Sequence, residues 1–204
     1  LDKKEECPHY VAFEAISKSN HLNEVKLSRG SNCTSLDALM IAKESDEVVW
    51  LIPIEWKYTE SYNSEDKSSK KSGETRLDNY QDLIRKSEQL KQKYDGYQGS
   101  IYFQEPYYQL MRQTLWAELS LGDFSANKFL HLHIVPEANK ELLTRKFKRF
   151  QEFPWFAKGM VDTWRSQLKD PNLYLFKDPK TVFESIKDSY SDLFNYLNER
   201  YWKE

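Results

Sequence analysis

Two strand-like segments joined by a short acidic turn constrain the fold of this chain more than any other feature. Residues 35–42 and 48–59 both have strand character, and the stretch between them is charged. Residues 48–54 are almost continuously apolar, which is typical of a central strand buried on both faces. Pro53 cannot donate a ladder hydrogen bond, so we expect a bulge or distortion just before Glu55. The pattern predicts a hairpin inside a sheet.

Three charged side chains fall on the two strands of this predicted hairpin. Asp37 lies on the first strand, and Glu55 and Lys57 lie on the second. Side chains alternate across a strand, so Glu55 and Lys57 point to one face and Trp56 to the other. Antiparallel pairing can place Asp37 beside Glu55. Two carboxylates and an ammonium in one small volume suit a magnesium-dependent site that cleaves phosphodiesters.

The rest of the chain alternates helical and strand patterns. Helices are expected at 9–18, 77–92, 107–121, 139–150, 156–167 and 179–202, and further strands at 128–135 and 172–176. Residues 61–74 are polar, and we expect a mobile excursion there. Asp178 ahead of Pro179 is typical of a helix start. The order predicts an α/β fold, a mixed central sheet flanked by helices. We expect a single domain over 1–204, with 139–204 as a mostly helical extension.

The composition is consistent with one folded domain and limits the kinds of partner that are expected. Of 204 residues, 39% are hydrophobic and 15% aromatic, which is enough for a core. The formal net charge is −2, whereas compact DNA-binding modules are usually basic, so charge argues mildly against tight nucleic-acid binding. No apolar run approaches the roughly 20 residues that span a membrane, and no apolar signal core begins the chain. Cys7 and Cys33 make no disulfide framework, so a reducing, cytoplasmic setting is expected.

The spacing of the charged residues resembles a known nuclease signature. Segment 35–38, Ser-Leu-Asp-Ala, followed by segment 54–57, Ile-Glu-Trp-Lys, resembles the PD-(D/E)XK motif of the restriction-endonuclease-like superfamily. It looks especially like a group of largely uncharacterised bacterial proteins within it. The resemblance is anchored in residues 30–58 and extends to about residue 135 through the order of helices and strand. Leu36 stands where the motif's name has proline, a position that varies among members.

The resemblance implies roles for the residues of the motif. Asp37 and Glu55 would bind one or two Mg²⁺ ions, or Mn²⁺ in their place. The main-chain carbonyl of Trp56 would add a metal ligand. Lys57 would orient or help deprotonate the attacking water and stabilise negative charge at phosphorus. The implied activity is metal-dependent hydrolysis of a nucleic acid, with DNA as the expected substrate.

The resemblance also implies two contributions from helices. Members often supply a further acid from the first helix, and Glu14 is the best-placed match, with Glu24 second. Polar groups on the helix after the motif often touch the substrate. Gln81 lies on the helix expected there, together with Tyr80 and Arg85.

A basic stretch in the second half interleaves charge with two phenylalanines. Such a stretch could track a phosphate backbone. A solvated helix face with its phenylalanines packed inward is somewhat favoured, and the two interpretations are compatible. Its charged residues are Arg145, Lys146, Lys148 and Arg149.

Structural explanations compete with each functional one. Glu55 and Lys57 could simply form an ion pair that contributes little to stability, and Asp37 could be an ordinary residue at a strand end. His131 and His133 share a strand face and could bind a transition metal, but a packed pair lining the sheet is favoured because no third ligand lies nearby. A zinc site is also conceivable, although its spacing matches no familiar finger. Its ligands would be Cys7, His9, His21 and Cys33.

Three functional hypotheses follow. The leading one is a Mg²⁺-dependent nuclease that acts on DNA, as a homodimer if it cuts both strands. The alternative is a non-catalytic module on the same fold that binds nucleic acid or protein. The third is an interaction protein that uses an apolar stripe near its end as a dimer seam, although packing of that stripe within its own domain is favoured. The stripe is Phe183, Ile186, Tyr190, Leu193, Phe194 and Leu197.

Overall fold

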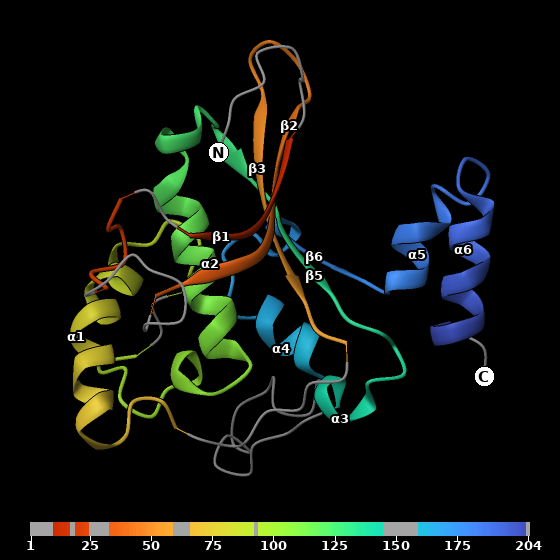
Figure 1. Cartoon of the computed structure of the whole chain (residues 1–204). Helices are drawn as coiled ribbons and strands as arrows, with labels where there is room; N and C mark the ends of the chain where they lie inside the picture. Colours follow the sequence, from red (N-terminus) through yellow and green to blue (C-terminus); the bar gives the residue numbers. More distant parts are fainter. Residues whose placement is uncertain are drawn as a thin grey trace.

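A mixed sheet forms the centre of the protein. The computed structural model describes residues 10–16, 19–24, 33–58, 66–91, 94–144 and 159–202. The strands are β1 (Tyr10–Ile16), β2 (Ser35–Lys43), β3 (Val49–Trp56), β4 (Lys128–Phe129), β5 (His131–Ile134) and β6 (Tyr174–Lys177). They lie in the order β1-β2-β3-β5-β6, with β4 also paired to β3 (Figure 1). β1 to β3 are antiparallel, and β3, β5 and β6 are parallel. The predicted α/β class is confirmed.

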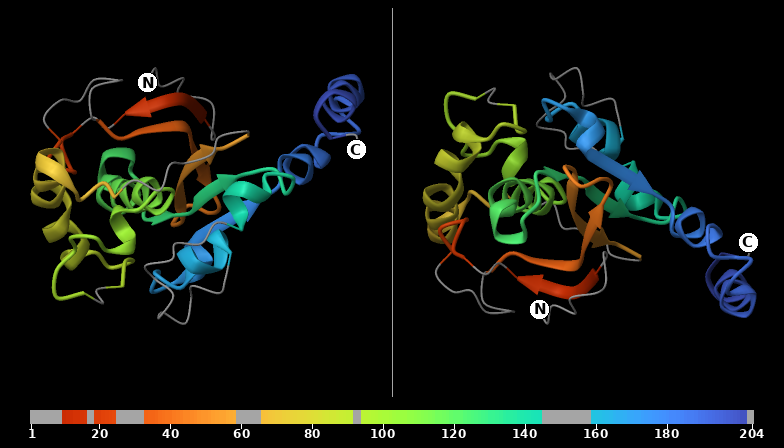
Figure 2. Two further views of the ribbon diagram at one scale, coloured as in Figure 1. Left: turned by 90° about the horizontal axis from the view of Figure 1, so that it is seen from below. Right: turned by 90° about the horizontal axis from the view of Figure 1, so that it is seen from above.

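Helices flank this sheet. They are α1 (Lys70–Lys86), α2 (Tyr107–Ser120), α3 (Lys140–Leu143), α4 (Met160–Arg165), α5 (Pro179–Glu184) and α6 (Ser191–Leu197). α2 packs on the central strands β3 and β5, and α1 packs against α2. α5 and α6 stand at the far end of the molecule from α1 in both views of Figure 2. The predicted helix over 107–121 and the predicted cap at Asp178, which accepts from the N–H of Lys180, are confirmed.

The sheet has two unlike faces. The inner face lies under α2 and belongs to the main core, which contains Leu39 and Leu51. The outer face carries a smaller apolar cluster around Ala38, Ile54 and Ile134, against which α5 packs. The site described below depends on both faces, because adjacent residues of β3 alternate between them.

Pro53 is accommodated by a break in the neighbouring strand. β4 pairs with β3 up to Leu51, and β5 begins to pair at Ile54. The N–H of Trp56 points toward β2 and that of Lys57 toward β5. Because N–H groups alternate in direction along a strand, the missing N–H of Pro53 faces the break between β4 and β5. The proline therefore removes no ladder hydrogen bond.

The first element is a strand, so the predicted helix over 9–18 is wrong. Glu14 has a left-handed φ of 51°, and the register of β1 with β2 passes over it. The pairs on either side, Phe13 with Ala38 and Ala15 with Leu36, keep one register, so the strand is distorted at Glu14 without an inserted residue and its side-chain alternation changes there. Ala12 and Ala15 are consequently both buried, three residues apart. This spacing imitates the period of a helix and explains the error.

Helix α1 begins inside the polar stretch 61–74, earlier than expected. The described part of that stretch starts at Asp66, whose Oδ1 accepts from the N–H of Ser68 at 2.9 Å. The N–H of Lys67 donates to the carbonyl of Phe103 at 2.8 Å. One local side-chain contact and one backbone contact with a distant segment hold these residues, which bury little apolar surface, so hydrophobic patterning did not detect them.

The C-terminal segment is two short helices rather than the predicted single one. A continuous helix would separate residues 183 and 202 by about 28 Å, at 1.5 Å per residue. Instead the rings of Phe183 and Trp202 lie 5.9 Å apart, and those of Phe194 and Trp202 lie 5.7 Å apart. The chain turns back so that three aromatic rings share one small core, which a straight helix of this length cannot form.

Candidate active site

Glu55 is buried beneath α2 and fully engaged by hydrogen bonds. It is 1% exposed. Its Oε1 accepts from Nε2 of Gln109 at 2.6 Å and lies 2.5 Å from Nζ of Lys57. Its Oε2 accepts from Nε2 of Gln113. One strand and one helix therefore fix the orientation of this carboxylate.

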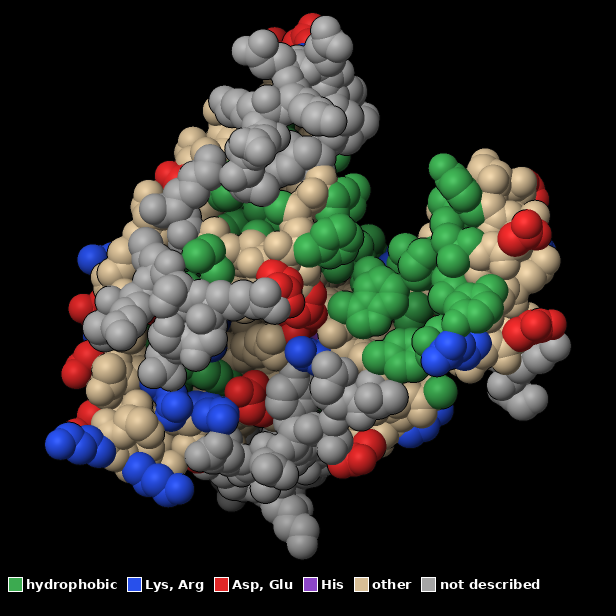
Figure 3. All heavy atoms as spheres, in the orientation of Figure 1, with side chains coloured by type: hydrophobic (Ala, Val, Ile, Leu, Met, Phe, Trp, Pro, Cys, Tyr) green, Lys and Arg blue, Asp and Glu red, His purple; other side chains and the backbone are tan. Residues whose placement is uncertain are grey.

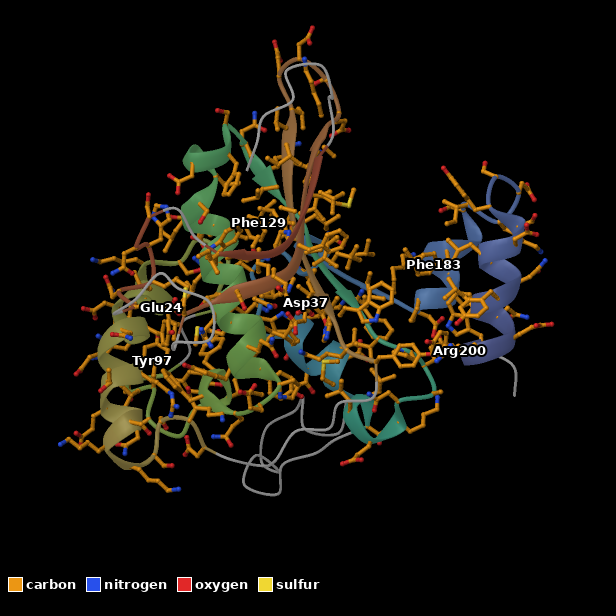
Figure 4. All side chains as sticks on the ribbon, viewed as in Figure 1. Glu24, Asp37, Tyr97, Phe129, Phe183 and Arg200 are labelled. Atoms are coloured by element: carbon orange, nitrogen blue, oxygen red, sulfur yellow. The ribbon has the colours of Figure 1, made fainter. Side chains whose placement is uncertain are left out.

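Asp37 lies on β2 at the solvent-exposed edge of the same site. Its Oδ2 accepts from the backbone N–H of Trp56 at 2.7 Å. The last register pair before it is Ala38 with Ile54, so Asp37 stands level with Glu55. Figure 4 shows Asp37 at the centre of the molecule, where the hairpin meets the helices. The structure thus brings Asp37, Glu55 and Lys57 together.

The environment of Glu55 disfavours its negative charge. Burial raises the pKa of Glu55 to about 7, the ammonium of Lys57 opposes that rise, and the carboxylate of Asp37 adds to it. An anion in a medium of low dielectric is costly unless a cation compensates for it. The site is therefore suited to the gain of a further positive charge near Glu55.

The donor chemistry fits a hard divalent cation. Asp37 and Glu55 offer carboxylate oxygens, the ligands that Mg²⁺ prefers. In the parts of the chain that the structure describes, no group of three or more His, Cys, Asp or Glu side chains could hold a metal ion. An ion held here would take only two carboxylates from the described residues and the rest of its ligands from water or substrate, which is common for Mg²⁺.

A second buried network holds the start of β2 against α2. Glu24 is 3% exposed. Its carboxylate accepts from the N–H of Thr34 at 2.7 Å, from the hydroxyl of Tyr80 at 2.7 Å and from Nη2 of Arg112 at 3.1 Å. Nε of Arg112 also donates to Oγ1 of Thr34 at 3.0 Å. Thr34 comes three residues before Asp37, so this network positions the strand that carries Asp37.

A polar pocket of about 120 Å³ separates the two networks. It is lined by Cys33, Thr34, Ser35, Glu105, Gln109, Arg112 and Gln113. Within the described chain, Oε2 of Glu105 and Oε1 of Gln113 are buried without a hydrogen-bond partner. Burial raises the pKa of Glu105, while Lys67 is the strongest influence opposing that rise. The pocket thus presents acceptors beside the glutamines that hold Glu55.

None of the hydrogen bonds described for Glu55 involves the other predicted site residues. Glu14 is exposed on β1, a strand rather than a helix, and the register of β1 with β2 sets it opposite Asp37. Glu24 is committed to the network with Arg112. Gln81 is half-buried on α1, and none of the hydrogen bonds described for the chain connects it to Glu55. The basic residues at 145, 146, 148 and 149 lie outside the described residues, as do Cys7 and His9 of the conceivable zinc site.

The two histidines of β5 form a packed pair, as predicted. Both are 1% exposed on the inner face. Nδ1 of His133 lies 2.7 Å from the hydroxyl of Tyr174, and Nδ1 of His131 lies 3.4 Å from Oγ1 of Thr114. Burial lowers the pKa of His131 to about 3 and lowers that of His133 as well. Both rings are therefore neutral core residues.

Sequence reasoning missed the glutamines of α2 as partners of Glu55. Gln109 and Gln113 are one helical turn apart, so they share a face of the helix. Most residues of α2 are buried, and most of the buried ones are apolar or aromatic. Two amides at this spacing in such a helix are unusual, because a buried amide needs a partner. The four-residue spacing of these two glutamines was the sequence signal that could have identified them as partners of a buried group.

The fold is that of an α/β protein with a mixed sheet, and the family match adds that the protein is restriction-endonuclease-like. The chain belongs to the family described as restriction endonuclease associating with ARP, whose model matches residues 2–202. Comparisons with curated proteins and with solved structures found no match. Among the described residues, no helix has the length and apolar character needed to cross a membrane.

Proposed function

We propose that this protein is a Mg²⁺-dependent nuclease that hydrolyses phosphodiester bonds in DNA at Asp37, Glu55 and Lys57. The observation that supports this most is the buried carboxylate of Glu55, held by two glutamines and a lysine with the carboxylate of Asp37 beside it. The family description supports nuclease chemistry. A bound Mg²⁺ would supply Lewis acidity at the phosphate and lower the pKa of a bound water.

The protein's own side chains would orient the reacting groups. Gln109 and Gln113 fix the rotamer of Glu55, so its carboxylate is positioned before substrate binds. Lys57 is 13% exposed at its side chain and touches Glu55. An ammonium carries three N–H donors, so Lys57 can hold a carboxylate and still donate to a water or to a phosphoryl oxygen. Asp37 faces solvent, where the phosphate would arrive.

A cleavage assay tests the assignment. Supercoiled plasmid, linear duplex, single-stranded DNA and RNA would each be incubated with Mg²⁺ or Mn²⁺. We expect DNA to be cut, and Asp37→Asn, Glu55→Gln and Lys57→Met each to abolish cutting. Asp82→Asn is the matched control, because Asp82 is an exposed carboxylate on α1 that pairs only at the surface with Arg85. Activity retained in Glu55→Gln, with the variant folded, would refute the assignment.

A non-catalytic binding module is the second candidate. Both oxygens of Glu55 already accept hydrogen bonds, and the formal net charge of the chain is −2, which is unfavourable for a polyanionic substrate. Calorimetric titration of Mn²⁺ separates the candidates. A nuclease binds Mn²⁺, alone or with DNA present, and loses it in Glu55→Gln. Absence of binding under both conditions supports the module.

A further inference from the structure

Basic side chains gather at the start of α1. Lys70 and Lys71 are exposed in its first turn, and Lys67 and Arg76 are half-buried before and after that turn. Residues 66–76 carry four basic and two acidic side chains, a net charge of +2, whereas the formal net charge of the whole chain is −2. We call Lys67, Lys70, Lys71 and Arg76 the α1 basic patch.

Acids near the α1 basic patch oppose it only in part. Residues 67–71 hold three lysines and no acid. Asp66 comes just before them and is committed to the turn, because its Oδ1 accepts from the N–H of Ser68 at 2.9 Å and from the hydroxyl of Ser68 at 2.6 Å. Glu74 and Asp78 are exposed further along α1 and reduce the positive charge there. The region is therefore most positive at the first turn.

This first turn carries a charge that its own helix disfavours. The partial positive charge at the start of a helix favours acids, yet the first turn of α1 contains none and begins with two lysines. Lys70 also has a left-handed φ of 61°, which costs free energy for a residue other than glycine. Local costs of this kind are typical of functional sites. A bound anion would offset the electrostatic part of the cost.

The surrounding structure holds the α1 basic patch in place. The N–H of Gly99 donates to Oγ of Ser68 at 2.6 Å, and the N–H of Lys67 donates to the carbonyl of Phe103 at 2.8 Å. Nη1 of Arg76 donates to the carbonyl of Lys67 at 3.1 Å. The backbone under these cations is thus fixed before any partner arrives, which lowers the entropic cost of binding.

The α1 basic patch continues a row of cations that begins at the proposed active site. Nζ of Lys67 lies 3.9 Å from Oε1 of Glu105. Burial raises the pKa of Glu105, and Lys67 and, more weakly, Lys57 oppose that rise, so both ammonium groups lie near this carboxylate. Lys57 in turn contacts Glu55. Figure 3 shows basic side chains over α1 on the face whose centre holds Asp37 in Figure 4.

The position of the patch selects its partner among polyanions. A nucleic acid presents about one negative charge per 1.7 Å of duplex axis, so a row of cations can contact successive phosphates. An acidic protein surface also carries negative charge, but nothing would require it to lie beside a site suited to phosphodiester hydrolysis. A substrate strand bound near Lys57 has to continue over a neighbouring surface, and the α1 basic patch lies on the same face.

We propose that the α1 basic patch binds the phosphate backbone of the nucleic-acid substrate beside the bond that is cleaved. Contacts of this kind fix the position of a strand and carry no sequence information. The inference rests on the proposed nuclease function and names the surface that holds its substrate. Lys70 and Lys71, which are the exposed members, contribute most of the binding.

DNA binding without cleavage tests the proposal. Fluorescence anisotropy measures the Kd of the whole chain for a short labelled duplex, in EDTA and again with Ca²⁺, over a range of KCl concentrations. The patch variant combines Lys70→Gln with Lys71→Gln. The control combines Arg85→Gln with Lys86→Gln in the last turn of the same helix, about 22 Å away along its axis. Both variants remove two positive charges, so the net charge of the chain is matched.

The patch variant should bind about tenfold or more weakly than wild type. Its plot of log K against log salt should become shallower by about 1.8, because each cation that contacts a phosphate contributes about 0.9 to the slope. A merely structural defect would not change the slope in this way. The control variant should keep the wild-type slope and lose little affinity. Circular dichroism shows whether each variant is folded.

Three results would overturn the proposal. They are equal losses in the patch and control variants, no measurable binding by wild type in either buffer, and polyglutamate that binds more tightly than the duplex and is lost in the patch variant. The last result would assign the patch to an acidic protein. The cleavage assay tests the nuclease function separately, so DNA cutting by wild type together with any of these results would refute the patch alone.

Discussion

Nζ of Lys57 lies 2.5 Å from Oε1 of Glu55 in the layer between β3 and α2. Glu55 lies on β3 and Lys57 directly follows its last residue, so in this extended segment the two side chains share the inner face. The contact compensates part of the cost of burying Glu55, and the glutamines of α2 compensate more. The chemistry of the site therefore depends on the packing of α2 against the sheet.

Removal of one glutamine should destabilise the protein through Glu55. In Gln113→Leu the carboxylate stays buried with one donor fewer, which costs about 1–3 kcal/mol of unfolding free energy. Urea unfolding measures the loss. Gln98→Leu is the control, because Gln98 is exposed in a turn and should change stability little. Equal stabilities for the two variants would contradict the hydrogen bond between Gln113 and Glu55.

The Glu24–Arg112 pair should contribute far more to the free energy of unfolding than a surface ion pair does. Arg112→Met leaves Glu24 buried and without its cation, and the loss should be about 3–5 kcal/mol. Arg85→Met breaks an exposed pair with Asp82 on α1 and should cost about 0–1 kcal/mol. Chemical denaturation of both variants gives the comparison. A small effect in both would show that Arg112 does not hold β2 against α2.

Acid should destabilise the protein through His131. Its folded pKa, about 3, lies below its ordinary value of 6.5, so between these pH values the unfolded state binds more protons. Stability is therefore complete above pH 6.5 and falls as pH drops toward 3, by up to about 1.4 kcal/mol per unit for one group. His131→Phe keeps a ring against Tyr174 and removes the proton.

The test for His131 is a difference of two stability curves. Unfolding free energies of wild type and His131→Phe would be measured from pH 7 to pH 4, since carboxylates that titrate in both proteins cancel in the difference. The unfolding free energy of His131→Phe, relative to that of wild type, should rise as pH falls. Parallel curves would show that His131 is not protected from protonation.

The start of α1 should not tolerate a side chain at Gly73. A Cβ there would lie 2.2 Å from the backbone of Ser68, which cannot give way as a flexible side chain would. Gly73→Ala should cost about 1–3 kcal/mol or more, despite the better helix propensity of alanine. At Gly96 a Cβ meets nothing within 4 Å, so Gly96→Ala serves as the control. Thermal unfolding distinguishes the two.

Patterns that depend on near neighbours were predicted well. The hairpin of β2 and β3, the common face of Glu55 and Lys57, helix α2 and the cap at Asp178 all follow from alternation, helical period or capping within a few residues. Local patterns misled where one distorted residue changed the spacing of buried side chains, as Glu14 did with its left-handed φ. They also misled where distant groups decided the outcome, as in the aromatic cluster at Trp202.

Local chemistry alone was enough to place two acids and a lysine on adjacent strands of an α/β protein, because the pleat dictates which side chains share a face. Only tertiary packing decided that Gln109 and Gln113, 54 and 58 residues from Glu55, would close over it. It also left Phe13 of β1 exposed to solvent. These outcomes depend on which helix covers which face, and that is settled by the burial of apolar surface over the whole chain rather than by neighbouring residues.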